Sequence, residues 1–148
     1  SAGGLTALGV AARHSALVAA VVAAYPVGDI TELDDVTHRF EAHYNRTLMG
    51  DVDETRRKSL ERSPLQRAGE LAATPMLLMH GDVDPVVPVQ QSRRLAEAVR
   101  AAGGEVELKV YEGEGHGFRD PVNKRDEYLR TEAFLVRHLS RRGIASLT

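Results

Sequence analysis

The fold class is indicated most clearly by one stretch of the sequence, Pro75-Met-Leu-Leu-Met-His-Gly-Asp-Val-Asp-Pro-Val-Val-Pro88. Residues 75–80 form an almost unbroken apolar run that ends at Gly81, and a run so short favours a strand buried on both faces over a helix. Such strands occur in parallel sheets that helices cover. Residues 82–88 are rich in Asp and Pro and therefore predict a loop, which places carboxylates directly after the buried strand.

The segments on both sides continue this pattern of strands and helices. Residues 17–24 are apolar and end before Pro26, which predicts a second buried strand, and residues 105–112 alternate, which predicts a third strand nearer an edge. This order predicts an α/β fold in which parallel strands are flanked by helices. Helices are predicted at 4–13, at 89–102 before Gly103-Gly104, and at 123–141 with Tyr128, Leu135 and Leu139 facing inward.

Residues 28–73 differ in character from the predicted strands. They are polar, carry charges of both signs, and predict helices near 35–48 and 53–59. We interpret this segment as a helical excursion that either packs over the sheet edge or forms a cap facing substrate. In the second case, Tyr25 and Phe40 are candidates to line a pocket. Residues 1–148 otherwise form a single domain.

Length and composition restrict the class of protein. With 148 residues, 43% of them hydrophobic, and a formal net charge of −2, the chain suits one globular domain and has no basic excess for nucleic acid or an acidic membrane surface. No apolar run reaches the roughly 20 residues that a membrane-spanning helix needs. The absence of cysteine excludes disulfides, a thiol nucleophile and thiolate metal sites, and it fits a reducing compartment such as the cytoplasm. A homo-oligomer is left open.

Groups suited to acyl transfer stand next to the predicted elements. His116 lies between two glycines just past the third predicted strand, where the backbone is free to bend and aim the imidazole. Asp82 and Asp84 follow the strand quoted above, and the carboxyl ends of parallel strands meet at one edge of a sheet. Ser1-Ala2-Gly3-Gly4 precedes a helix and matches the second half of Gly-x-Ser-x-Gly, in which a serine nucleophile occupies a tight turn with small neighbours. Serine, acid and histidine follow one another along the chain in the order of an α/β-hydrolase triad.

These motifs resemble the carboxyl-terminal catalytic half of prolyl oligopeptidase-type serine peptidases, a group that includes acylaminoacyl peptidases and dipeptidyl peptidases. The resemblance implies the carboxyl-terminal portion of an α/β-hydrolase fold with an incomplete sheet. We therefore expect a fragment of a longer hydrolase, inactive alone or in need of the missing upstream part of its own domain. The resemblance extends from Ser1 to about Leu139 and rests on residues 75–88, Gln90-Gln-Ser92, Tyr111-x-Gly113-x-Gly115-His116-Gly-Phe118 and the upstream Arg62-Ser63-Pro64.

The resemblance also implies the role of individual residues. Ser1 would be the nucleophile, His116 the general base and Asp84 the acid that orients it. Asp82 would be a turn residue that caps its own backbone. The backbone N–H of Ala2 would supply one oxyanion donor, and an upstream loop would supply the second.

The other histidines and the acidic residues near His116 have simpler interpretations. His80, at the end of a strand, is expected to be a packed structural residue, and Glu112 and Glu114 are expected to be solvated. No set of histidines and carboxylates has the spacing of metal ligands, so we predict neither a metal nor another cofactor. Surface or packing positions are expected for His14, His38, His43 and His138.

The leading hypothesis is a serine peptidase that cleaves short peptides through a Ser–His–Asp acyl-enzyme mechanism. A carboxylesterase or a dienelactone hydrolase-like enzyme would use the same residues on a small ester or amide substrate. An amino-terminal nucleophile hydrolase would account for Ser1 but not for the loops that carry Asp84 and His116. The hypothesis outside the enzymes is a non-catalytic α/β-hydrolase-fold module that serves binding or assembly.

Overall fold

Three parallel strands form the centre of the fold. In the computed structural model, which describes residues 1–32 and 52–143, they are β1 (Val21–Ala24), β2 (Met76–Gly81) and β3 (Val106–Tyr111). The described strands are ordered β1-β2-β3, with parallel pairing on both sides of β2. The α/β architecture predicted from the sequence, with parallel strands flanked by helices, is confirmed.

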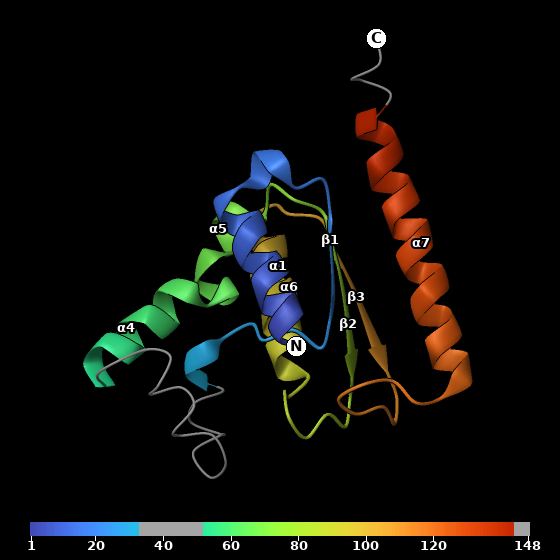
Figure 1. Ribbon diagram of the computed structural model, residues 1–148, viewed down its shortest axis with the longest axis horizontal. Coiled ribbons are helices and arrows are strands. Elements are labelled where there is room, and N and C mark those ends of the chain that lie inside the picture. Colours follow the sequence, from blue (N-terminus) through green and yellow to red (C-terminus); the bar gives the residue numbers. More distant parts are fainter. Residues whose placement is uncertain (33–51, 144–148) are drawn as a thin grey trace.

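Helices cover both faces of this sheet (Figure 1). The helical elements are α1 (Ala2–Arg13), η1 (Ser15–Leu17), α4 (Val52–Arg62), η2 (Pro64–Arg67), α5 (Ala68–Leu71), α6 (Gln90–Ala101) and α7 (Pro121–Gly143). Among them, α1, α5 and α6 pack on one face, and α7 packs on the other. The sheet is therefore the middle layer of three.

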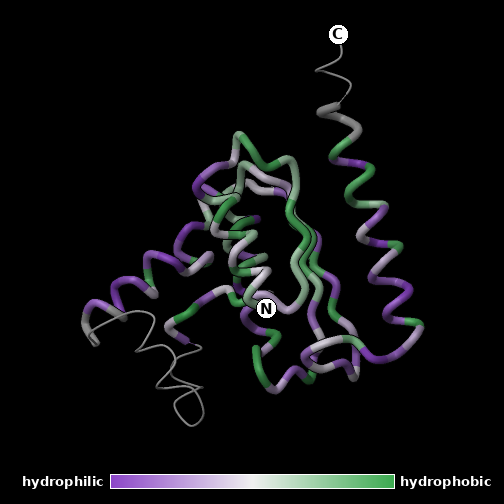
Figure 2. The backbone as a smooth tube through the Cα atoms, in the orientation of Figure 1, coloured by the Kyte–Doolittle hydropathy of each residue, from purple (hydrophilic) through white to green (hydrophobic). Residues whose placement is uncertain are grey.

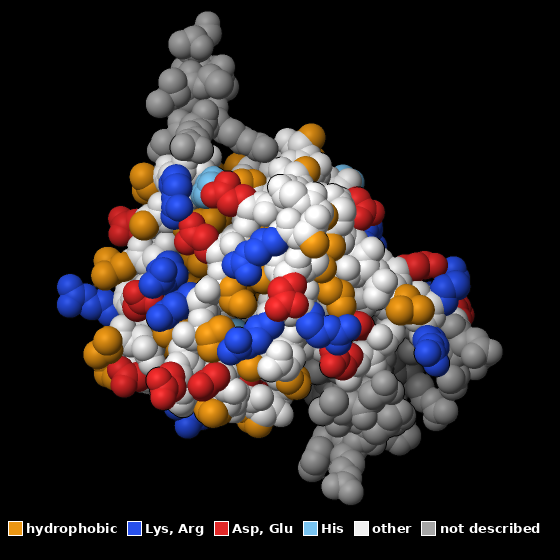
Figure 3. Space-filling model, turned by 180° about the vertical axis from the view of Figure 1, so that it is seen from behind, with side chains coloured by type: hydrophobic (Ala, Val, Ile, Leu, Met, Phe, Trp, Pro, Cys, Tyr) orange, Lys and Arg blue, Asp and Glu red, His pale blue; other side chains and the backbone are white. Residues whose placement is uncertain are grey.

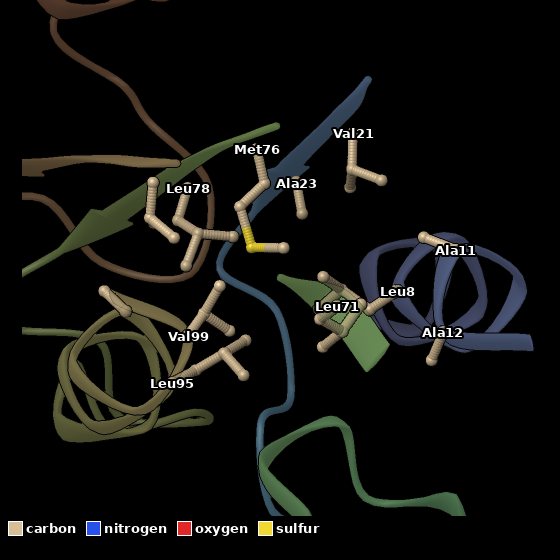
Figure 4. Close-up of a cluster of buried hydrophobic side chains, with 12 residues drawn as sticks. Leu8, Ala11, Ala12, Val21, Ala23, Leu71, Met76, Leu78, Leu95 and Val99 are labelled. Atoms are coloured by element: carbon tan, nitrogen blue, oxygen red, sulfur yellow. The ribbon is translucent and has the colours of Figure 1, made fainter. Parts of the chain in front are cut away.

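The side chains of β2 divide between two buried clusters, one on each face of the sheet. Met76 and Leu78 join the cluster with α1 and α6, whereas Leu77 and Met79 join the cluster with α7. Alternate residues of a strand face opposite sides of a sheet, so a strand that is apolar at successive positions needs cover on both sides. Figure 2 shows the hydrophobic band that the strands form. In the first cluster, Figure 4 shows these β2 side chains above Leu8, Leu71, Leu95 and Val99.

Two details of the predicted packing are wrong. The strand predicted at residues 17–24 is shorter: β1 begins at Val21, because the 3₁₀ helix η1 extends to Leu17 and leaves the Leu17 side chain 84% exposed. In α7, Tyr128 and Leu139 are 74% and 50% exposed, while Phe134 is fully buried in the cluster with β2. The apolar residues of α7 lie on more than one face of the helix, and the buried face carries Phe134, with Leu135 partly buried against the same cluster as predicted.

Part of the polar excursion belongs to the hydrophobic core. The predicted helix at 53–59 corresponds to α4, which is longer than expected, and Leu71 of α5 is fully buried in the same cluster as α1 and α6. The predicted helix at 35–48 lies outside the described residues, and so does Phe40. That residues 28–73 form a cap stays a prediction.

The described surface carries charges of both signs. Figure 3 shows Lys and Arg side chains interspersed with Asp and Glu on one face of the molecule. Within residues 1–32 and 52–143, no helix combines the length and the hydropathy that crossing a membrane requires. The amino terminus lies near the carboxyl ends of the strands (Figure 1), so the first residue of the chain comes close to the loops that leave β2 and β3.

Candidate active site

The acidic residue of the site lies in the loop after β2. The carboxylate oxygen Oδ1 of Asp84 accepts hydrogen bonds from the backbone N–H groups of Val86 (2.8 Å) and Val87 (2.9 Å). This local turn fixes the carboxylate and leaves its other oxygen, Oδ2, directed at the neighbouring loop. The Asp84 side chain is fully buried, so its charge depends on hydrogen bonds rather than on water.

The imidazole of His116 lies between the other two predicted residues. Its Nδ1 is 2.8 Å from Asp84 Oδ2, and its Nε2 is 3.2 Å from Ser1 Oγ. When Nδ1–H donates to the carboxylate, Nε2 is the acceptor and the Ser1 hydroxyl donates to it. Gly117, with φ of 106°, adopts a left-handed conformation that other residues rarely adopt, and this allows the loop to turn back toward Ser1. The structure thus brings the three predicted side chains into one hydrogen-bonded chain.

The serine stands at the start of α1. Ser1 is the N-cap of that helix, and its carbonyl accepts the N–H of Leu5 (3.0 Å). Ala2, the first helical residue, has an N–H without an intrahelical acceptor, as every helix N-terminus does. A Cβ on Gly4 would lie 3.0 Å from Pro26 Cβ, so the small residue there permits the close approach of α1 to the chain after β1.

Hydrogen bonds keep the acid ionised. Burial alone would raise the pKa of Asp84, but the N–H of Val87, the imidazole of His116 and the N–H of Val86 all favour the carboxylate. Together they outweigh burial and hold the pKa of Asp84 below its ordinary value. The site therefore keeps a negative charge beside the imidazole at neutral pH.

The acid loop and the histidine loop are fixed to each other by their backbones. The N–H of Val83 donates to the carbonyl of Glu114 (3.1 Å), and a Cβ on Gly81 would collide with that same carbonyl. Asp82 is a turn residue, but its Oδ1 accepts the N–H of Gly113 (2.7 Å) in the other loop instead of capping its own backbone as predicted. Both acidic residues therefore have defined positions, and only Asp84 faces the imidazole.

Glu114, predicted to be solvated, is only 4% exposed and anchors the loop of His116. Its carboxylate accepts the backbone N–H groups of Arg119 (2.7 Å) and Asp120 (2.9 Å) and the side-chain amide of Asn123 (2.9 Å). The hydrogen bond from Asn123, followed by those from the backbone, holds the pKa of Glu114 below its ordinary value. The prediction failed because these donors come from later residues that fold back over the carboxylate. The signal available in the sequence was a carboxylate at a loop that leads directly into a helix.

The remaining predictions on histidines and acids are met where the structure describes the residues. His80 is fully buried, with Nδ1 2.7 Å from Ser92 Oγ and Nε2 2.8 Å from the carbonyl of Val87. His14 and Glu112 are exposed. His138 is buried and packs on Phe134, with ring centroids 4.5 Å apart, while His38 and His43 lie outside the described residues.

A cleft follows the two loops of the site. Its volume is about 960 Å³, and its walls include Pro85 and Val86 of the acid loop and the imidazole of His116. In the described part of the chain, no group of three or more His, Asp or Glu side chains is arranged to hold a metal ion. Of the three hydrogen-bonded side chains Ser1, Asp84 and His116, only His116 is among the residues that line this cleft.

Comparison with known proteins identifies the family. A model of the prolyl oligopeptidase family matches residues 1–142. The chain belongs to the prolyl oligopeptidase family. Its strands and helices superpose on those of a puromycin hydrolase with a TM-score of 0.78 and 36% sequence identity, over 96% of this chain and 21% of that one. The chain thus contains a portion of the α/β-hydrolase fold of its peptidase relatives.

Two curated relatives show how the similarity is distributed. Dipeptidyl aminopeptidase BIII of Pseudoxanthomonas mexicana is 35% identical over 97 residues, which are 64% of this chain and 14% of the relative. A monoacylglycerol lipase of Mycolicibacterium smegmatis is 38% identical over 107 residues, which are 70% of this chain and 32% of the relative. The matched part of this chain therefore spans less than a third of the length of either relative.

Proposed function

We propose that this chain carries the catalytic Ser–His–Asp residues of a serine peptidase that cleaves short peptides through an acyl-enzyme. Ser1 is the nucleophile and His116 the general base. Asp84 orients the imidazole and balances the positive charge that forms on it. One observation carries the proposal: both ring nitrogens of His116 have partners of the required kind, a buried carboxylate at 2.8 Å and a serine hydroxyl at 3.2 Å.

The chemistry follows from this arrangement. As Ser1 Oγ forms a bond to the substrate carbonyl carbon, its proton moves to His116 Nε2, and Asp84 stabilises the resulting imidazolium. The same proton then passes to the leaving amine as the C–N bond breaks, and water repeats the sequence to release the acid. The N–H of Ala2 is one donor to the oxyanion.

Short peptides and aminoacyl amides are the proposed substrates. Family membership supports peptide-bond hydrolysis, and the name of one relative, a dipeptidyl aminopeptidase, supports a short acyl group at the amino-terminal side of the cleaved bond. The similarity to a monoacylglycerol lipase favours a second candidate, an esterase that uses the same three residues. The two candidates differ in the leaving group, an amine or an alcohol.

Labelling with a fluorophosphonate probe tests the mechanism. The full-length gene product that carries this chain should be labelled, and Ser1→Ala and His116→Ala should each abolish labelling. His14→Ala, which changes an exposed histidine beyond the other end of α1, is the matched control and should label like the wild type. Absence of labelling in the folded wild type would favour a non-catalytic module.

A substrate pair separates the two enzyme candidates. An aminoacyl arylamide and the aryl ester of the same amino acid share the acyl group, so only the leaving group differs. A peptidase should hydrolyse both, since esters are the easier substrates for a serine nucleophile. Turnover of the ester with none of the arylamide would overturn the peptidase in favour of the esterase.

A further inference from the structure

Tyr25 has a backbone conformation that is unusual for its residue type. Its φ is 40°, and within residues 1–32 and 52–143 it is the only residue other than glycine with a positive φ. Bulky L-residues avoid this left-handed region because the Cβ crowds the backbone. Where such a conformation persists, the surroundings hold it, and it tends to accompany a functional site.

The surroundings of Tyr25 hold its backbone from two sides. Its N–H donates to the carbonyl of Met79 (2.6 Å), which continues the pairing of β1 with β2. The next residue, Pro26, lies against Gly4 in the first turn of α1, the helix that begins at Ser1. The turn at residue 25 is therefore fixed between the central strand and the nucleophile helix.

This turn places the phenol ring on the imidazole. The ring centroids of Tyr25 and His116 are 4.6 Å apart at an interplanar angle of 52°. Phe118 packs edge-on with the Tyr25 ring, with centroids 5.6 Å apart, and itself packs on Tyr111 with centroids 4.5 Å apart. The Tyr25 ring is thus held in place by the core cluster beneath α7 and contacts the imidazole directly.

The His116 ring moves by rotation about its Cα–Cβ and Cβ–Cγ bonds. The hydrogen bonds to Asp84 and Ser1 oppose such rotation at the two nitrogens. The Tyr25 ring, in contact with the imidazole, blocks rotation of the imidazole toward its side. An aromatic ring within about 6 Å also attracts a cation through its quadrupole, so it favours the imidazolium over the neutral imidazole.

We propose that Tyr25 is a positioning residue for the general base. Resting on the function proposed above, Tyr25 keeps the imidazole of His116 in line between Asp84 and Ser1 and stabilises the imidazolium that forms when the serine proton is transferred. It takes no proton and forms no bond with the substrate. Its effect belongs to the transition state, so it acts on kcat and not on KM.

Tyr25→Leu in the full-length protein tests the role, with the aminoacyl arylamide as substrate. We expect kcat to fall roughly tenfold with KM unchanged, because the imidazolium loses its aromatic neighbour. Tyr25→Phe keeps the ring and should retain kcat within about twofold. Tyr128→Leu makes the same change at an exposed position of α7 and should leave both constants unchanged.

The alternatives give other results. A rise in KM with kcat unchanged would make Tyr25 a wall of the substrate pocket, and unchanged constants would make its contact incidental; either result overturns the proposal. If Tyr25→Leu does not fold, Tyr25→Asn replaces it, since asparagine tolerates the left-handed conformation, and the same fall in kcat is expected. A folded wild type without labelling or turnover would overturn the proposed function as well, whereas an active wild type with an equally active Tyr25→Leu overturns the role of Tyr25 alone.

Discussion

Two histidines approach the same carboxylate oxygen and have opposite relations to solvent and to the serine. His116 Nδ1 lies 2.8 Å and His80 Nε2 lies 3.4 Å from Asp84 Oδ2. His80 is fully buried and both of its nitrogens have fixed partners in the fold, whereas the side chain of His116 is 24% exposed and its Nε2 faces Ser1. Distance to the Asp84 carboxylate therefore does not separate the two rings, whereas the partner of the second nitrogen does.

The partners of His80 determine which of its two nitrogens carries the proton. Its Nε2 faces two acceptors, the carbonyl of Val87 and the carboxylate of Asp84, so the ring carries its proton there and Nδ1 accepts from the hydroxyl of Ser92. Burial lowers the pKa of His80 and keeps the ring neutral. A neutral His80 ring orders the acid loop without bringing a positive charge to Asp84.

Asp84→Asn changes the carboxylate that both histidine rings approach, and it should cause the largest fall in kcat among these variants. The amide keeps an acceptor for the N–H groups of Val86 and Val87, but it removes the charge that stabilises the imidazolium of His116. We expect kcat to fall by about 10³-fold to 10⁴-fold, as is typical when the acid of such a triad is replaced by its amide. Steady-state hydrolysis of the aminoacyl arylamide by the full-length protein measures this.

Asp82→Asn is the matched control for this prediction. It makes the same chemical change two residues earlier in the same loop, where the side chain accepts the N–H of Gly113. An asparagine oxygen can accept that hydrogen bond, so kcat should stay within about threefold of the wild type. Equal losses for the two variants would mean that the loop needs carboxylates in general and that Asp84 has no special role.

Much of this arrangement could be predicted from local sequence, because the signals are local. The run of residues 75–80 predicts a strand buried on both faces, and positions just past parallel strands predict where Asp84 and His116 gather. His80, with apolar neighbours at the strand end, could likewise be interpreted as a packed residue. These predictions need only periodicity and the rule that parallel strands end at one edge, whereas the choice of Asp84 over Asp82 in the same loop rests on the resemblance to prolyl oligopeptidase-type peptidases.

What could not be predicted depends on contacts between distant segments. The burial of Glu114 follows from a loop that folds back over it, and the φ of 40° at Tyr25 follows from β2 and α1 holding the chain on either side. The inward face of α7 is decided by which side chain fits the cluster with β2, and Phe134 occupies it. Neither periodicity nor motif spacing contains this information.

His80→Ala removes the buried ring and tests whether its role is structural. It should lower stability more than it lowers kcat. The substitution leaves a cavity and removes the partners of the Ser92 hydroxyl and the Val87 carbonyl, so we expect the free energy of unfolding of the full-length protein to fall by about 3 kcal/mol. Ser92→Ala removes a single hydrogen bond and should cost about 1 kcal/mol. Chemical denaturation measures both. A fall in kcat as large as that of Asp84→Asn, with stability unchanged, would contradict a structural role for His80.

The pH dependence of stability should separate His80 from Asp84, and it is the smallest expected effect. Because burial lowers the pKa of His80 in the folded state, the unfolded chain binds its proton first, and stability is lost as pH falls below about 6.5, the ordinary value for histidine. The pKa of Asp84 is also lowered, but its contribution is lost only below about 3.9. Between these limits the slope from His80 is at most about 1.4 kcal/mol per pH unit, the value for one proton. His80→Gln keeps a side-chain amide that can donate a hydrogen bond, and it should reduce the pH dependence of the unfolding free energy in that range. A slope against pH identical to that of the wild type would show that His80 has the same pKa in the folded and unfolded chains, which would contradict the prediction.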